Sequence, residues 1–150
     1  MRIIIIGTPG TGKTTLSKKL CAEKGIKYYS FLSLMKKQFK TVLNLEEKQT
    51  KKFLNNFFKD KNNFLLDGFL AYWLDKEYVD TCIVLETNIN ILKERLEKKK
   101  YSEQKIKDNL EAETFEHLLI EAEENNHNIK LIKTNDTLKE NYKHVKQSII

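Results

Sequence analysis

The residues best suited to chemistry form a short glycine-rich stretch near the N-terminus. The stretch reads GTPGTGKTT, from Gly7 to Thr15, and fits the pattern G-x-x-x-x-G-K-[ST] between an apolar run and a helical pattern. Glycines let the backbone turn its N–H groups inward around a phosphate, and the helix that follows adds the positive end of its dipole. The spacing therefore predicts a phosphate-binding loop. The alternative is a glycine turn that binds nothing.

Six residues of this loop are predicted to contact a bound nucleotide. They are Gly10, Thr11, Gly12, Lys13, Thr14 and Thr15. In loops of this pattern the lysine reaches the β- and γ-phosphates, and the hydroxyl that follows it binds Mg²⁺. We therefore predict that Lys13 is catalytic, that Thr14 is a metal ligand, and that the cofactors are ATP and Mg²⁺.

One carboxylate follows the apolar run from Phe64 to Leu66. Because Asp67 closes this run, it should emerge at the carboxyl edge of a parallel sheet, beside the phosphate loop, where nucleotides bind. There Asp67 would hold Mg²⁺ through water and take part in catalysis. The alternative is an aspartate that caps the next turn.

Arginine is scarce in a chain that has 27 basic residues and a net charge of +6. The two arginines are Arg2, expected at the outer end of the first strand, and Arg95. Arg95 lies four residues before Lys99, so both side chains can project from one helical face toward the same phosphates. We predict that Arg95 is catalytic and that Lys99 binds the nucleotide. The alternatives are a solvated basic face over residues 93–100, or contact of the lysines in this part of the chain with RNA phosphates.

Five short apolar runs alternate with helical patterns along the chain. The runs lie at residues 2–6, 26–29, 64–66, 81–85 and 129–132. Helices are expected over residues 13–24, 30–39, 44–58, 88–99, 102–125 and 136–147. Strands that alternate with helices predict an α/β fold, in which a five-stranded parallel sheet is flanked by helices on both faces.

Length and composition favour one compact domain over residues 1–150. Apolar residues make up 40% of the chain and charged residues 32%, so a packed core is expected instead of disorder. The longest apolar run is too short to span a bilayer, and the N-terminus lacks the features of a signal peptide. We therefore expect a cytoplasmic protein without membrane contact, present also in the nucleus if its source is eukaryotic. Cys21 and Cys82 are expected to be buried thiols.

A longer stretch, from Leu92 to Ala122, carries a specific resemblance. It reads LKERLEKKKYSEQKIKDNLEAETFEHLLIEA. Its Arg-Leu-Glu stretch, its Tyr, and the Lys, Asn, Ala-Glu and Phe that follow resemble the lid of the adenylate kinase 6 family, also called CINAP. Members of this family are small P-loop kinases linked to ribosome assembly.

The resemblance implies a P-loop NTPase fold like that of nucleoside monophosphate kinases. The acceptor region would cover about residues 30–56, and the lid about residues 98–108. Thr134 and Asn135 would lie near the adenine of ATP, and Asn135 is predicted to bind the cofactor.

Four features depart from the family's pattern: a lost histidine, a changed lid, an acidic residue after the fourth strand, and a shorter acceptor region. They are found at Phe69, at Lys99-Lys100, at Glu86, and between about Phe39 and Thr41. The family's Asp-x-His motif here ends in Phe69, so the histidine attributed to water activation is missing.

The residues and the resemblance together predict an ATP-dependent nucleoside monophosphate kinase of the adenylate kinase type, which converts ATP and AMP to two ADP, with a side ATPase activity. The implied partners are a small-subunit ribosomal protein and the pre-ribosome, and direct RNA contact is left open. The alternatives are a non-kinase ATP-binding factor in ribosome assembly, or a kinase of another small metabolite. Phe31 or Phe39 would line the base pocket of the acceptor, and the other aromatic residues of this region are expected in the core.

Overall fold

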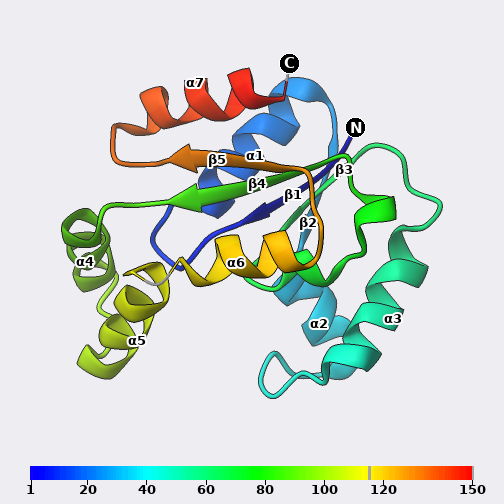
Figure 1. Ribbon diagram of the computed structural model, residues 1–150, viewed down its shortest axis with the longest axis horizontal. Coiled ribbons are helices and arrows are strands. Elements are labelled where there is room, and N and C mark those ends of the chain that lie inside the picture. The colour runs from blue at the N-terminus through cyan, green and yellow to red at the C-terminus, as the bar shows by residue number, and fades with distance from the viewer. Residues whose placement is uncertain (115, 150) are drawn as a thin grey trace.

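A five-stranded parallel sheet forms the centre of the molecule (Figure 1). The computed structural model describes residues 1–114 and 116–149. The strands are β1 (Arg2–Ile6), β2 (Lys27–Ser30), β3 (Phe64–Asp67), β4 (Thr81–Glu86) and β5 (Ile129–Lys133). Their order is β2-β3-β1-β4-β5, and every neighbouring pair is parallel. The predicted fold class and the five predicted strands are confirmed.

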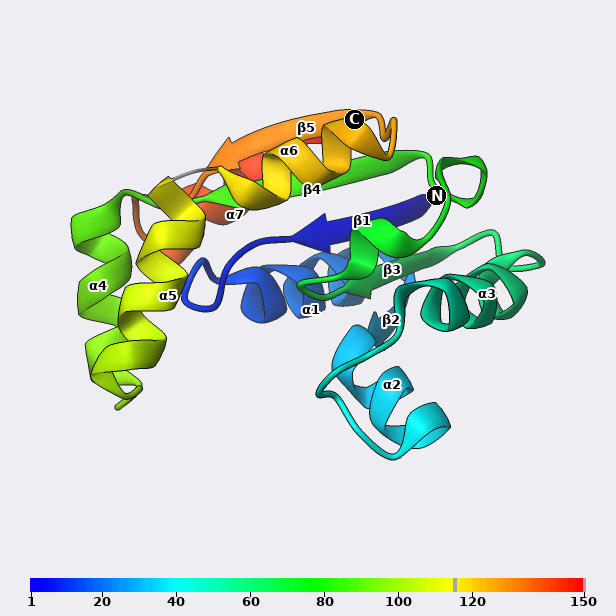
Figure 2. The ribbon, with the colours of Figure 1, turned by 60° about the horizontal axis from the view of Figure 1, so that its bottom comes forward.

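Helices cover both faces of the sheet (Figures 1 and 2). One face packs against α1 (Lys13–Lys24) and α7 (Leu138–Ser148). The other face packs against α2 (Phe31–Phe39), α3 (Glu47–Phe58), α6 (His117–Glu124) and the short 3₁₀ helix η1 (Ala71–Trp73), which η2 (Lys76–Tyr78) follows. Because both faces are covered, the four isoleucines of β1 are buried, as their unbroken apolar run predicts.

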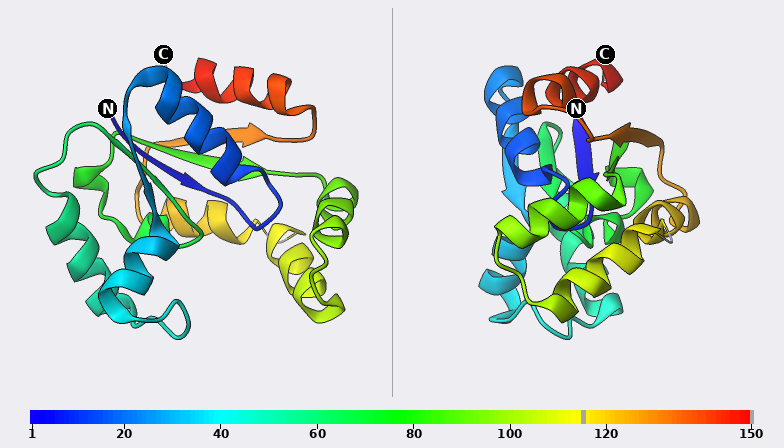
Figure 3. Two further views of the ribbon diagram at one scale, coloured as in Figure 1. Left: turned by 180° about the vertical axis from the view of Figure 1, so that it is seen from behind. Right: turned by 90° about the vertical axis from the view of Figure 1, so that its left-hand side faces the viewer.

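Two further helices lie beyond the carboxyl ends of the strands. They are α4 (Ile89–Lys98) and α5 (Glu103–Thr114), and the right-hand view of Figure 3 shows them in front of this edge of the sheet. They pack on each other through a separate apolar cluster of Leu92, Leu96 and Ile106. The predicted lid, at about residues 98–108, therefore covers the end of α4, the connection and the first half of α5, within a helical pair that has a small core of its own.

The prediction of one helix over residues 102–125 is wrong. Helix α5 ends at Thr114 and α6 begins at His117; between them Glu116 has a φ of 52°, outside the helical range. Helix α5 packs on α4, whereas α6 packs on the sheet through Leu118 and Ala122. A single straight helix cannot cover both surfaces. Phe115, which falls within the predicted helix, lies outside the described residues.

Helix α3 begins at Glu47 instead of Asn44. The carboxylate of Glu46 caps it, because its oxygens accept hydrogen bonds from the backbone N–H groups of Lys48 at 3.1 Å and Gln49 at 2.7 Å. Asn44 has a φ of 53°, which places it in a turn before the helix. The predicted helix start at residue 44 is therefore wrong.

Both cysteines are buried free thiols, as predicted. Burial raises the pKa of the Cys21 thiol to about 11 and that of the Cys82 thiol to about 12. Within residues 1–114 and 116–149, no helix combines the length and the apolar character needed to cross a membrane.

Candidate nucleotide-binding site

The predicted phosphate loop connects β1 to α1 at the carboxyl edge of the sheet (Figure 1). Gly10 has a φ of 94° and Gly12 a φ of 89°, left-handed conformations that glycine adopts at little cost. Gly12 occupies the N-cap position of α1. Because glycine has no side chain to accept hydrogen bonds from the first N–H groups of the helix, these groups are available to an anion.

Two predicted site residues lie beside this loop and Lys13: Lys99 lines a cavity together with Gly10, Thr11 and Gly12, and Asp67 ends β3, which pairs with β1 just before the loop. Burial lowers the pKa of the Lys13 ammonium; the nearby Asp67 carboxylate opposes this effect, and the nearby Lys99 ammonium adds to it. Thr14, next to Lys13, is exposed, as is Thr15. The fold thus brings the predicted catalytic lysine, the predicted metal-binding carboxylate and a lid cation to one place.

The oxygen atoms of this site suit a magnesium ion. Asp67 ends β3 and is 4% exposed, and its Oδ2 accepts a hydrogen bond from the Tyr28 hydroxyl at 2.8 Å. Its second oxygen and the exposed Thr14 hydroxyl are donors of the kind that Mg²⁺ prefers. The residues present therefore fit a Mg²⁺ ion held by Thr14 and, through water, by Asp67. Tyr28 was not among the residues predicted from the sequence.

Arg95 joins the phosphate loop to the connection between β5 and α7. Its Nη1 donates to the Gly10 carbonyl at 3.2 Å, and its Nη2 donates to the Thr134 carbonyl at 2.9 Å. Burial lowers the pKa of this guanidinium. The predicted site residue is thus in place, with two of its N–H groups already bound to backbone oxygens.

A cavity of about 440 Å³ opens beside Arg95. The phosphate loop forms one wall, through Gly10, Thr11, Gly12 and Thr15. Helix α4 contributes Arg95, Lys98 and Lys99, and the remaining lining residues are Leu16, Asp136, Leu138 and Asn141. This cavity combines cations from the lid with an apolar side chain at the start of α7.

Asn135 lines a different cavity, of about 330 Å³. Its Oδ1 accepts a hydrogen bond from the backbone N–H of Asn88 at 2.6 Å. This hydrogen bond leaves the side-chain NH₂ group of Asn135 as the donor for the predicted contact with adenine. The preceding residue, Thr134, faces the site through the carbonyl that binds Arg95.

Glu113 of α5 holds the lid against the phosphate loop. Its Oε2 accepts a hydrogen bond from the Thr8 hydroxyl at 2.5 Å, and its Oε1 accepts one from the Thr87 backbone N–H at 3.1 Å. The pKa of this carboxyl is raised above its ordinary value, because the effect of burial exceeds the opposing effect of the two hydrogen bonds. Sequence reasoning did not assign Glu113 a role, although its Ala-Glu pair belongs to the stretch that carries the family resemblance.

The predicted acceptor region, at about residues 30–56, covers α2, the loop over residues 40–46 and most of α3. Phe31 is 1% exposed and packs against Gly68, where an added Cβ would lie 2.2 Å from the Phe31 Cβ. Of the two candidates for a base pocket, Phe31 therefore belongs to the core. Phe39 is half-buried and, with Phe53, lines a cavity of about 370 Å³.

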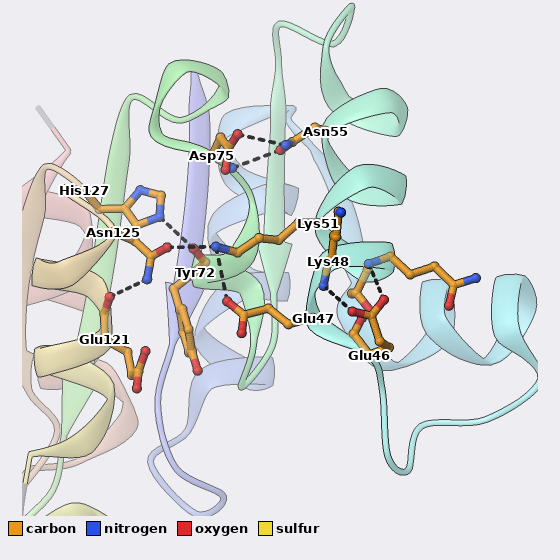
Figure 4. Close-up of polar contacts among 12 residues, drawn as sticks. Glu46, Glu47, Lys48, Lys51, Asn55, Tyr72, Asp75, Glu121, Asn125 and His127 are labelled. Atoms are coloured by element: carbon orange, nitrogen blue, oxygen red, sulfur yellow. Dashed lines mark hydrogen bonds and ion pairs between the residues drawn. The ribbon is translucent and has the colours of Figure 1, made fainter.

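Polar contacts hold α3 to the rest of the protein (Figure 4). The Asn55 amide donates to the Asp75 carboxylate at 2.9 Å and accepts from the Asp75 backbone N–H at 3.0 Å. Lys51 pairs with Glu47 at 3.3 Å and donates to Asn125 at 3.5 Å. The loop before α3 is less enclosed, since Leu43 is 72% exposed.

Phe69, which stands where the family has its histidine, is half-buried against the core. Among the chain's own histidines, His127 is buried, and its Nε2 lies 2.9 Å from the Tyr72 carbonyl (Figure 4). His117 and His144 are exposed. His127 therefore joins the end of α6 to η1.

Comparison with known proteins decides the family. A protein-family profile described as an AAA domain matches residues 3–116. A putative adenylate kinase from Methanocaldococcus jannaschii is 36% identical over 131 residues, which are 81% of this chain and 72% of the relative. An adenylate kinase isoenzyme 6 homolog from Dictyostelium discoideum is 33% identical over 129 residues, or 80% of this chain and 73% of the relative. The chain belongs to the adenylate kinase 6 family.

Solved structures with little sequence identity share the fold of this adenylate kinase 6 family member. Shikimate kinase from Aquifex aeolicus has a TM-score of 0.67 at 19% identity, covering 99% of this chain and 96% of its own. A gluconokinase from Sinorhizobium meliloti also has a TM-score of 0.67, at 10% identity, covering 99% and 90%. The fold is therefore that of P-loop kinases. With the family, it makes the protein a kinase.

Proposed function

We propose that this member of the adenylate kinase 6 family transfers the γ-phosphoryl group of ATP to a nucleoside monophosphate, with AMP as the preferred acceptor. The observation that carries the proposal is the arrangement around the phosphate loop, where Lys99 lines a cavity together with the loop and Asp67 ends the strand beside β1. The names of the relatives, putative adenylate kinase and adenylate kinase isoenzyme 6 homolog, support AMP as the acceptor.

Phosphoryl transfer requires positive charge around the transferring group and exclusion of water more than it requires a nucleophilic side chain. The N–H groups of the phosphate loop would bind the β-phosphate, and Lys13 and Lys99 would neutralise charge on the transferring oxygens. Thr14 and Asp67 would hold Mg²⁺, which neutralises further phosphate charge when bound.

Arg95 would bind ATP from the cavity of about 440 Å³ that it lines. Its bonds to the Gly10 and Thr134 carbonyls join the phosphate loop to the segment after β5. Lys99 lines the same cavity, four residues further along the chain. We therefore assign Lys99 to the transferring phosphoryl group and Arg95, whose guanidinium is held by two carbonyls, to the nucleotide, with Leu138 beside the adenosine.

The proposal is tested by measuring ADP formation from ATP with AMP, CMP, GMP or UMP in turn, alongside ATP binding by calorimetry. We expect turnover with AMP to exceed that with the other three monophosphates, and to require Mg²⁺. Intact ATP binding without turnover of any monophosphate would refute the phosphotransferase. Preferred turnover of CMP, GMP or UMP would support the phosphotransferase but would identify that monophosphate, instead of AMP, as the acceptor.

A second activity, ATP hydrolysis, should be slower than transfer to AMP, because Phe69 stands where the family has its histidine. We expect Phe69→His to raise ATP hydrolysis in the absence of acceptor, and an unchanged rate would argue against a role for this position. The implied link to small-subunit assembly stays a prediction. Recovery of ribosomal protein or pre-ribosome with the tagged protein from extracts of its own source would support it.

A further inference from the structure

Tyr28 and Asp67 project from neighbouring strands on the face of the sheet that α1 covers. The register pairs Tyr28 with Leu65 and Ser30 with Asp67, so Asp67 lies two residues beyond the partner of Tyr28. Successive side chains of a strand alternate between the two faces, and Tyr28, Leu65 and Asp67 therefore share one face. Leu65 belongs to the apolar cluster under α1, and Tyr28 packs against this cluster. The strand pairing thus sets the phenol beside the carboxylate.

The contact between them is a hydrogen bond inside a mostly enclosed site. The Tyr28 hydroxyl donates to Asp67 Oδ2 at 2.8 Å, and the aspartate is 4% exposed. Burial and then Asp67 raise the pKa of the phenol. The hydroxyl therefore lies against the carboxylate that would hold a magnesium ion through water.

We propose that Tyr28 is a positioning residue for the magnesium complex of ATP. Its hydroxyl occupies Asp67 Oδ2 and leaves Oδ1 to the water shell of Mg²⁺. Lys13 lies near the same carboxylate. Without the phenol, Asp67 is free to turn toward the Lys13 ammonium, and this ion pair withdraws the carboxylate from the metal and the lysine from the phosphates. The inference rests on the proposed function and deepens it.

The test is Tyr28→Phe, which keeps the ring and its packing but removes the donor. Calorimetry measures the affinity for ATP with Mg²⁺ and, separately, with the metal removed by chelation. We expect the variant to bind ATP with Mg²⁺ about tenfold more weakly, the loss typical of a residue that orients a metal ligand, and to bind ATP alone within about twofold of the wild type. Tyr29→Phe is the matched control, because this ring packs edge-on against Phe57 and Phe58 on the opposite face. It should leave both affinities unchanged.

The effect of Tyr28→Phe on ATP affinity should also depend on the carboxylate of Asp67. In an Asp67→Asn background, Tyr28→Phe should cause no further loss of the Mg²⁺-dependent part of ATP affinity. Equal loss with and without Mg²⁺, wild-type affinity in both conditions, or a full effect in the Asp67→Asn background would each overturn the inference. If the wild type itself bound ATP equally well with and without Mg²⁺, this result would refute the proposed metal site. It would therefore be distinguishable from the results that refute only the role of Tyr28.

Discussion

Different kinds of contact stabilise the proposed ATP side of this kinase, around the phosphate loop, and its proposed acceptor side, around α2 and α3. On the ATP side, the loop, α4 and α5 are joined by hydrogen bonds from Arg95 to Gly10 and from Thr8 to Glu113. On the acceptor side, aromatic packing dominates: the Phe58 ring lies 5.3 Å from the Tyr29 ring and 4.4 Å from the Phe64 ring, measured between centroids.

This difference predicts that substitutions on the ATP side reduce activity, whereas substitutions on the acceptor side reduce stability. A half-buried ammonium such as that of Lys13 is costly to desolvate, and its proposed role lies in the reaction. Altering the proposed ATP side should therefore remove function while the fold persists. A buried aromatic ring contributes mainly to the free energy of unfolding. Altering the core beneath the acceptor helices should therefore unfold the protein before it affects ATP binding.

The largest expected effect is on turnover, from Lys13→Met. Removal of this charge should lower kcat by roughly 10²–10³-fold, the range seen when one group that stabilises transition-state charge is lost. Because burial lowers the pKa of Lys13, its loss should leave the melting temperature unchanged or raise it. Lys24→Met, at the exposed end of α1, is the control and should change neither. A large fall in melting temperature for Lys13→Met would contradict the prediction that the ATP side affects activity and not stability.

The largest effect on stability should come from Phe58→Ala. Phe58 is fully buried, and truncation of such a ring costs about 3–5 kcal/mol in the free energy of unfolding. Chemical denaturation measures this loss, and calorimetry below the transition should find ATP affinity unchanged. Phe39→Ala, at a half-buried position, should cost less than half as much. Equal losses for the two variants would show that the acceptor region is not organised around Phe58.

Glu113→Ala should weaken ATP binding by an intermediate amount. The variant leaves the Thr8 hydroxyl and the Thr87 N–H without their shared acceptor, and so frees α5 from the loop. We expect about a tenfold rise in the Kd for ATP, equivalent to about 1.4 kcal/mol. Glu111→Ala, on the same helix but exposed, is the control. If both variants bound ATP like the wild type, the lid would not depend on this carboxylate.

The smallest expected effect is a pH-dependent gain in stability from Glu86→Gln. Burial first, and then Glu116 and Glu113, raise the pKa of Glu86 in the folded protein. A raised carboxyl pKa contributes stability below the unfolded value of about 4.3, and this contribution is lost as pH rises through the folded value. The glutamine variant should therefore melt at a higher temperature than the wild type at pH 7 and lose this advantage near pH 4.

Melting curves from pH 4 to pH 8 test this prediction, with Glu124→Gln at an exposed position as the control. A gain that did not depend on pH would mean that the charge of Glu86 is not its cause.

Much of the fold and the core of the site could be predicted because the signals are local. Gly7 to Thr15 are neighbours along the chain, and the loop's own hydrogen bond, from Thr11 to Thr8, spans three residues. The unbroken apolar run of β1 likewise reports burial on both faces without reference to any other segment. The ends of helices were harder to predict from the sequence. The break between α5 and α6 arises because the two helices pack on different surfaces, whereas the apolar pattern in the sequence continues across the break.

The amino-acid sequence alone therefore determined the phosphate loop, the alternation of strands and helices, and the position of Asp67 at a strand end. The three-dimensional fold decided which side chains complete the site. Tyr28 meets Asp67 across 39 positions of the chain, Arg95 meets Gly10 across 85, and Glu113 meets Thr8 across 105. Residue type and spacing do not reveal such pairs, because each forms only when strand order and helix packing bring distant segments together.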